Sequence, residues 1–211
     1  MKTIYFIRHS KALKFDNKDN FNNIFNTDNS RINNEKNVLS IEGEELAKDK
    51  MNNHELKNLD YVVASNYVRA ISTAKYLANY NNLPITIIPD FGERVIGTPI
   101  DGMEFSEYEH RQFYEPTFKF ADGECQKEVL KRYYDAFNKV FELDGDRIAV
   151  VSHATALSFF IKSLTKADYV DNRIIIEFNN KIVFDEEFYN CIIFKMIFDD
   201  NKELIDISVV E

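Results

Sequence analysis

The chain has 211 residues, a formal net charge of −9 and a hydrophobic content of 45%. These values exclude a globally disordered chain and predict one compact domain over residues 1–211. The acidic balance argues against a protein that binds a nucleic-acid duplex, because neutralising many phosphates requires clustered lysines and arginines.

The first predicted element is a short buried strand over residues 3–7, which are β-branched and aromatic and are followed at once by charge. Residues 14–37 are different, because they are rich in Asn, Asp and Lys and their apolar residues follow no period. This excursion is either a lid over the body of the domain or an exposed surface loop, and the sequence favours neither.

Strands and helices then alternate along the chain. Ser40 offers an N-cap for one helix, and Ser65 and Asn66 offer one for the next. Residues 91–123 hold four of the six glycines and are expected to form loop and short helix. The regular elements are expected as helices over 40–51, 67–80, 126–142 and 154–164, and as strands over 59–64, 85–88 and 147–152.

The C-terminal part is expected to contain strands joined by tight turns, over residues 173–178, 181–184, 190–198 and 203–209. Alternating strands and helices followed by a strand-rich end predict an α/β fold. The expected architecture is a three-layer α/β/α sandwich with a mainly parallel central sheet and antiparallel C-terminal strands. The chain contains no P-loop or Rossmann glycine pattern, which weighs against a nucleotide-binding site.

The apolar run near the N-terminus stops at Arg8, far short of a signal peptide or a membrane span. Cys125 and Cys191 lie far apart and lack the spacing of a zinc or redox site. A cytoplasmic location without membrane attachment is therefore expected.

Charged residues follow four of the predicted strands. Arg8 and His9 follow the first strand, and Arg69 lies at the start of the helix after the second. Glu93 follows the third strand, and His153 follows the strand over 147–152. Ligands of open α/β sheets bind beyond the carboxyl ends of the strands, so these side chains are expected to converge on one site.

This set of residues suits phosphoryl transfer through a covalent intermediate. A neutral imidazole such as that of His9 is a competent nucleophile near neutral pH. Two guanidiniums grip a phosphoryl group, and a second imidazole adds a donor. Glu93 is the candidate that protonates the leaving alkoxide.

Six segments carry a family resemblance. Residues 4–10 are similar to a strand that ends in Arg-His-Gly, and residues 64–74 are similar to a Ser-x-x-x-Arg-Ala-x-x-Thr-Ala segment. The other matching segments are 39–47, 91–97, 123–125 and 150–153. In this order they resemble the histidine phosphatase superfamily, which includes cofactor-dependent phosphoglycerate mutases and many phosphatases.

The resemblance implies a role for each residue at the strand ends. His9 would be the phosphorylated nucleophile, and Arg8, Arg69 and His153 would form the phosphate pocket. Glu93 would protonate the leaving group and then activate the water that hydrolyses phosphohistidine. Neither a metal nor another cofactor is expected.

Three positions depart from the family pattern. Ser10 replaces the glycine after the nucleophile, Phe15 stands where the family often has Asn, and Ala154 replaces the glycine after the second histidine. One phosphate contact is then missing unless Ser10, Asn17 or another loop residue supplies it. Ser10 is therefore an expected substrate-binding residue.

The resemblance leaves the substrate open. Residues 8–12 are closest to the Arg-His-x-Lys-Ala branch, which includes protein phosphohistidine phosphatases, whereas the Glu93 loop and the chain length resemble small-molecule phosphatases and mutases. A phosphorylated small molecule or a phosphoprotein is expected as partner, with no nucleic acid and no membrane. The oligomeric state cannot be deduced from the sequence.

The leading hypothesis is a metal-independent phosphatase of the histidine acid type, a phosphoric monoester hydrolase that works through phosphohistidine. One alternative is a bisphosphate-primed phosphoglycerate-type mutase, which needs further cations, and Arg94, Arg111 and Lys119 are the candidates. Another alternative is a catalytically silent, phosphate-binding regulatory domain, which the three departures motivate.

Overall fold

The computed structural model describes residues 1–13, 30–99 and 102–211. The beginning of the predicted excursion, with Phe15 and Asn17, lies outside the described residues.

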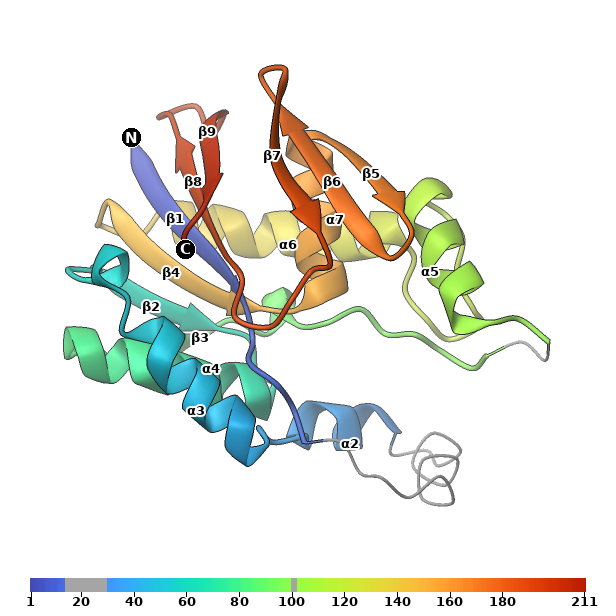
Figure 1. The fold of residues 1–211 in the computed structure, drawn as a ribbon, viewed down its shortest axis with the longest axis horizontal. Coiled ribbons are helices and arrows are strands. Elements are labelled where there is room, and N and C mark those ends of the chain that lie inside the picture. The colour runs from blue at the N-terminus through green and yellow to red at the C-terminus, as the bar shows by residue number, and fades with distance from the viewer. Residues whose placement is uncertain (14–29, 100–101) are drawn as a thin grey trace.

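A six-stranded central sheet organises the molecule, with the strand order β3-β2-β4-β1-β8-β9 (Figure 1). The first four strands in this order are parallel, whereas β8 and β9 are antiparallel to their neighbours. The strands span Lys2–Arg8 (β1), Tyr61–Ala64 (β2), Ile85–Ile87 (β3), Arg147–Ser152 (β4), Ile193–Phe198 (β8) and Leu204–Val209 (β9). The predicted mainly parallel sheet with antiparallel C-terminal strands is confirmed.

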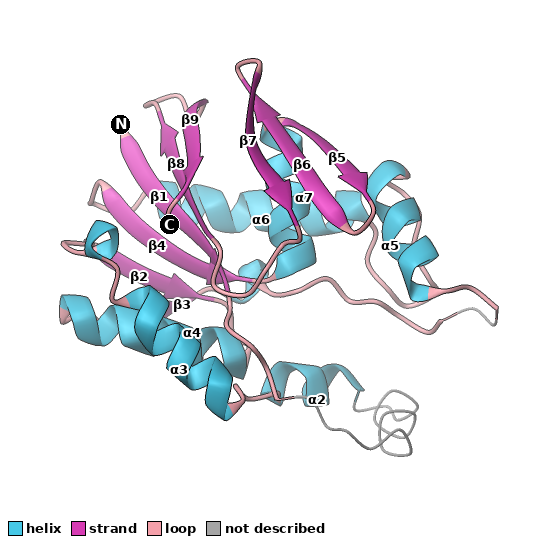
Figure 2. Cartoon of the chain, in the orientation of Figure 1, coloured by secondary structure: helices cyan, strands magenta, loops and turns pink. Residues whose placement is uncertain are grey.

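Helices cover both faces of this sheet (Figure 2). The alternation of β1 explains why two faces need cover, because Ile4 and Phe6 belong to one apolar core and Tyr5 and Ile7 to the other. Helices α6 (Gln126–Phe141) and α7 (Ala154–Leu164) supply the first core, and α3 (Ile41–Met51) and α4 (Val68–Asn81) supply the second. The three-layer α/β/α architecture is therefore confirmed.

A second, three-stranded antiparallel sheet lies outside the central one, in the order β5-β6-β7. Its strands span Lys166–Val170 (β5), Arg173–Phe178 (β6) and Lys181–Glu186 (β7). The sequence predicted two of these strands and missed β5, whose residues alternate between exposed and half-buried positions without a strongly apolar face. Helix α5 (Phe105–Tyr114) lies beside this small sheet, where the backbone N–H of Tyr169 donates to the Tyr114 hydroxyl at 3.0 Å (Figure 1).

The two helix caps predicted from the sequence had different outcomes. Ser40 accepts from the backbone N–H of Gly43 at 3.0 Å and caps α3 as predicted. The cap predicted for the next helix was wrong, because α4 begins at Val68 with Tyr67 as its N-cap and without a side-chain cap bond. The Ser65 hydroxyl bonds to Nε2 of His153 at 2.7 Å and accepts from the backbone N–H of Tyr67 at 3.3 Å, so it links two strand ends and the turn before α4.

The remaining described elements are short. They are α2 (Ser30–Lys36), which forms the end of the 14–37 segment, and the two 3-10 turns η1 (His54–Leu56) and η2 (Pro89–Phe91). Helices that are both long and apolar enough to cross a membrane are absent from the described parts of the chain.

Candidate active site

Three neighbouring strand ends form one edge of the central sheet. Because β2, β4 and β1 are adjacent and parallel, they place Ser65, His153 and His9 at the same edge. The backbone N–H of His9 donates to the Ser152 carbonyl at 2.9 Å, and that of Ser65 donates to Val151 at 3.1 Å. The rings of His9 and His153 meet edge to face, with their centroids 5.0 Å apart. The sheet itself therefore brings the two predicted histidines together.

His9 has a defined tautomer. Its Nδ1 lies 2.6 Å from the carbonyl oxygen of Ser10, and because a carbonyl only accepts, we assign the ring proton to Nδ1. Nε2 then carries the lone pair, and it accepts from Nε of Arg69 at 3.0 Å. Burial, followed by the charges of Arg69 and Arg8, holds the pKa of His9 well below its ordinary value. The ring is therefore neutral near pH 7 and offers Nε2 as an electron-pair donor.

His153 is fully buried behind His9, and its Nε2 lies 2.7 Å from the Ser65 hydroxyl. Burial, followed by the neighbouring His9 and Arg69, keeps the pKa of His153 well below its ordinary value. With the Ser65 hydroxyl donating to Nε2, we assign the ring proton to Nδ1. Within the described residues this buried Nδ1 has no hydrogen-bond partner. An unpaired buried donor costs free energy, so the position suits the oxygen of an anionic ligand.

Arg69 lies in the first turn of α4 and is only 5% exposed. Its guanidinium carbon stands 4.6 Å from the centroid of the Tyr67 ring, a cation–π distance. Nη1 donates to the backbone carbonyl of Asn34 at 2.7 Å and to the side-chain oxygen of the same residue at 3.2 Å. Helix α2 at the end of the 14–37 segment therefore contacts a predicted phosphate-binding residue.

Arg8 enters the site from the end of β1. Its Nη1 donates to the carbonyl of Phe188, whereas its buried Nε has no partner in the described parts of the chain. Burial lowers the pKa of Arg8, but a guanidinium remains charged at any physiological pH. Arg8 as a whole is half-buried, but its guanidinium offers one buried, unused donor to the site.

Ser10 follows the nucleophile candidate and is fully buried. Its hydroxyl donates to the carbonyl of Gly43 at 2.6 Å, and its backbone N–H donates to the Thr73 hydroxyl at 2.9 Å. These two bonds join the turn after β1 to α3 and α4, and they fix the carbonyl that holds the His9 ring.

Glu93 follows η2 and lies at the N-terminus of α7. Its carboxylate accepts from the backbone N–H groups of Ala156 and Arg94, each at 2.9 Å, and of Thr155 at 3.2 Å. A helix N-terminus is a favourable place for a carboxylate because its first N–H groups lack partners in the helix. Since α7 starts directly after His153, this arrangement holds Glu93 next to the histidine strand ends.

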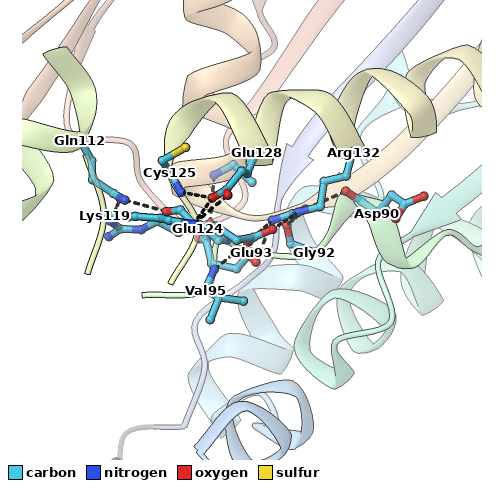
Figure 3. Close-up of polar contacts among 12 residues, drawn as sticks. Asp90, Gly92, Glu93, Val95, Gln112, Lys119, Glu124, Cys125, Glu128 and Arg132 are labelled. Carbon is cyan, nitrogen blue, oxygen red and sulfur yellow. Dashed lines mark hydrogen bonds and ion pairs between the residues drawn. The ribbon is translucent and has the colours of Figure 1, made fainter. Parts of the chain in front are cut away.

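An ion pair that the sequence did not reveal as functional fixes the Glu93 loop (Figure 3). Arg132 of α6 donates to both carboxylate oxygens of Glu124, at 2.8 Å and 2.9 Å. The same guanidinium donates to the carbonyls of Asp90 and Gly92 at 2.8 Å and of Glu93 at 3.1 Å. The sequence did contain one sign that Arg132 faces inward. It lies between Val129 and Tyr133, which both belong to the buried face of the amphipathic helix α6.

A cavity of about 420 Å³ opens beside Arg8. Its walls come from α5, from the start of α7 and from the small sheet, and among the predicted site residues only Arg8 is part of its lining. The cavity therefore lies next to the imidazoles and guanidiniums of the predicted site and shares Arg8 with it.

The cations proposed for a second acidic group are all paired with other residues. Arg94 is buried and bonds to Gln112 and Glu109. Arg111 pairs with Glu115 at 2.8 Å, and Lys119 pairs with Glu128 at 2.7 Å. None of the three cations is among the described residues that line the cavity.

Comparison with known proteins identifies the family of the chain. The model of the family described as the histidine phosphatase superfamily (branch 1) matches residues 4–182. No curated protein matches the sequence. The chain is similar in structure to the mycobacterial glucosyl-3-phosphoglycerate phosphatase in complex with inorganic phosphate, with a TM-score of 0.66, 12% identity and coverage of 100% of this chain and 96% of that one.

Two further solved structures share the fold. A phosphoglycerate mutase from Bacillus anthracis str. Sterne aligns with a TM-score of 0.65 and 16% identity, covering 99% of this chain and 92% of that one. A putative alpha-ribazole-5'-P phosphatase from Escherichia coli aligns with a TM-score of 0.58 and 19% identity, covering 90% of this chain and 98% of that one.

Proposed function

Because the chain belongs to the histidine phosphatase superfamily, we propose that it is a metal-independent phosphatase that hydrolyses phosphomonoesters through a covalent phosphohistidine intermediate. The observation that carries the proposal is the state of His9, a buried and neutral imidazole with its proton on Nδ1 and its lone pair on Nε2. A histidine that attacks phosphorus must be neutral, because only the neutral imidazole has a lone pair on one of its ring nitrogens.

The first half of the reaction transfers the phosphoryl group to His9. Nε2 forms a bond to phosphorus while the bond from phosphorus to the ester oxygen breaks. Arg69, the Nε of Arg8 and the Nδ1 of His153 stabilise the phosphoryl oxygens, because charge-assisted hydrogen bonds in a buried site are strong. The leaving oxygen takes a proton from Glu93.

The second half releases phosphate. A water molecule attacks phosphorus and loses a proton to Glu93, and the bond between Nε2 and phosphorus breaks. Glu93 is then protonated again and ready for the next ester. Proton transfer of this kind accelerates reactions roughly 100- to 10,000-fold.

The phosphatase is favoured over the mutase because a mutase must hold a substrate with a second acidic group. Arg94, Arg111 and Lys119 are not among the described residues that line the cavity beside Arg8, so they are not placed to bind such a group there. We also propose the cytoplasm as the location of the enzyme, because its two cysteines are free thiols.

Trapping the phosphoenzyme tests the proposal directly. We expect rapid quenching with a radiolabelled phosphomonoester to give a label on the wild-type protein that is stable in alkali and labile in acid. His9→Ala and the more conservative His9→Gln should lose both this label and the turnover of p-nitrophenyl phosphate, because they remove the imidazole Nε2 that forms the bond to phosphorus.

The matched control is His54→Ala, which removes an exposed histidine in η1 and should leave labelling and turnover unchanged. Thermal unfolding establishes that each variant is folded. Full turnover by either folded His9 variant would refute the covalent mechanism.

A further inference from the structure

The cavity beside Arg8 has the position of a leaving-group site. It is bounded by Ala154 and Thr155 at the start of α7 and by Arg8 at the end of β1. The Thr155 N–H also donates to the carboxylate of Glu93 at 3.2 Å, so one residue of the cavity wall contacts the proposed acid. Its volume of about 420 Å³ is large for a three-carbon acid and suits a group containing a ring.

Aromatic side chains make up much of the cavity wall. Phe113, Phe159 and Phe188 are buried and form its base. Phe105 is different, because this lining residue is 53% exposed. An exposed phenyl ring at the wall of a cavity offers a surface on which a flat ligand ring can stack.

The charge of the wall is negative. Two carboxylates, Glu109 and Glu187, line the cavity, whereas Arg8 is the one cation among the described lining residues. The guanidinium of Arg8 belongs to the phosphoryl group in the proposed mechanism. Burial raises the pKa of Glu109, and the charge of Arg94 partly opposes this shift.

The cations near this wall have other partners. Arg94 pairs with Glu109 itself at 3.1 Å and is almost completely buried. Lys162 donates to the backbone carbonyl of Phe113 and lies 4.2 Å from the centroid of the Phe113 ring. Glu187 has neither a hydrogen bond nor an ion pair to the described residues and is exposed. The cavity therefore combines aromatic surface with negative charge.

We propose that this cavity selects phosphomonoesters whose leaving alcohol contains an aromatic ring and carries a positive charge or none, and that it disfavours leaving groups with a second acidic group. The inference rests on the proposed phosphatase function and adds its substrate class. Stacking on Phe105 would recognise the ring. Glu187, which has no partner among the described residues, would attract a cation and repel an anion, whereas the charge of Glu109 is compensated by Arg94.

A matched set of aryl phosphates tests the charge preference. The set contains para-(aminoethyl)phenyl, para-ethylphenyl and para-(carboxyethyl)phenyl phosphate, in which two methylene groups keep the charge away from the phenol and the leaving groups are similar in intrinsic reactivity. We expect kcat/KM to fall in the order cationic, neutral, anionic. The first and last should differ at least about tenfold, because Glu187 attracts the ammonium group of one ester and repels the carboxylate of the other.

Two variants assign this preference to the cavity. Glu187→Gln should reduce the ratio of cationic to anionic kcat/KM about threefold or more, because it removes one of the two carboxylates. Glu186→Gln removes the same charge one position earlier, outside the cavity lining, and should leave the ratio unchanged. An anionic ester that is hydrolysed as well as the neutral one, or equal effects of the two variants, would overturn the proposal.

The aromatic preference has its own test. Phe105→Ala should lower kcat/KM for para-(aminoethyl)phenyl phosphate about three- to tenfold and for ethanolamine phosphate, which has no ring, much less. Equal losses for both substrates would contradict the stacking role. If every ester is hydrolysed in a His9-dependent manner without preference, the substrate class fails and the phosphatase stands, whereas absence of any hydrolysis means that the phosphatase itself fails.

Discussion

The nucleophile pocket and the acid loop of this protein are held in place by different means. His9 and His153 stand at the ends of adjacent parallel strands, and backbone hydrogen bonds of the sheet fix the distance between them. Glu93 lies on an irregular segment whose carbonyls are held by the side chain of Arg132, a residue of another helix. The pocket therefore inherits its geometry from the sheet, whereas the acid loop is held by the Arg132 guanidinium at its carbonyls and by the N-terminus of α7 at the Glu93 carboxylate.

The substitution Arg132→Met is the strongest test of whether the acid loop and the nucleophile pocket are held independently. Removing the guanidinium frees the carbonyls of the acid loop and leaves Glu124 without its ion-pair partner. We expect kcat for esters with poor leaving groups to fall about 100-fold, because small misplacements of a catalytic group have effects of this size. Activated esters such as p-nitrophenyl phosphate need less help from the acid, so their rate should fall less, and phosphorylation of His9 should persist.

Lys139→Met is the matched control for this variant. Lys139 lies on the same helix and pairs with Asp90 of the same segment, at 2.9 Å, but is exposed. An exposed ion pair contributes little, so this variant should retain the wild-type dependence on the leaving group. A uniform loss over all esters in Arg132→Met, with loss of the His9 label, would show that the pocket and the acid loop are not independently held.

The same contrast explains what the sequence could predict. The strand ends that carry Arg8, His9 and His153 follow from short apolar runs and from the rule that ligands bind at the carboxyl ends of parallel strands. Arg69 and Glu93 could be predicted in the same way because they follow two further strands. Each of these predictions needed only local information and a strand order.

Other features depend on contacts between distant residues and escaped prediction. The partners of Arg132 lie 8 to 42 positions away in the sequence, and no periodic pattern connects them. The prediction of Ser65 as a helix cap was wrong because α4 begins at Val68, with Tyr67 as its N-cap. The bond of the Ser65 hydroxyl to His153, 88 residues further along the chain, could not be seen in the sequence. The sequence predicted two of the three strands of the small sheet. The position of this sheet beside α5, which creates the cavity, results from tertiary packing and could not be predicted.

Burial of the nucleophile pocket predicts a dependence of stability on pH. The pKa values of His9 and His153 lie well below 6.5 in the folded protein, so the unfolded chain binds more protons than the folded one as the pH falls below about 6.5. Stability is therefore present above this value and is lost as the pH falls towards the folded pKa values. Between pH 7.5 and pH 5.5 we expect the free energy of unfolding to fall by about 1 kcal/mol for each histidine.

Urea unfolding at several pH values measures this loss. His153→Gln should remove about half of the slope, since it eliminates one of the two buried imidazoles, whereas the exposed His54→Gln should not change it. A slope that is the same in all three proteins would mean that burial does not control the protonation of the pocket.

Ser10 provides the smallest and most specific test of the pocket. If its hydroxyl serves only to join the turn after β1 to Gly43, Ser10→Ala loses one buried hydrogen bond and should lower the free energy of unfolding by about 1 kcal/mol, with a change in kcat/KM of less than about threefold. If the hydroxyl binds phosphate, KM and the inhibition constant for inorganic phosphate should both rise about tenfold, which corresponds to a lost hydrogen bond to a charged group. Because Ser10 also carries the carbonyl that accepts from Nδ1 of His9, a fall in kcat with unchanged phosphate binding would show a third role, the orientation of the nucleophile. The unfolding free energy, phosphate affinity and kcat of this one variant therefore separate a residue that binds substrate from one that holds the nucleophile in its reactive tautomer.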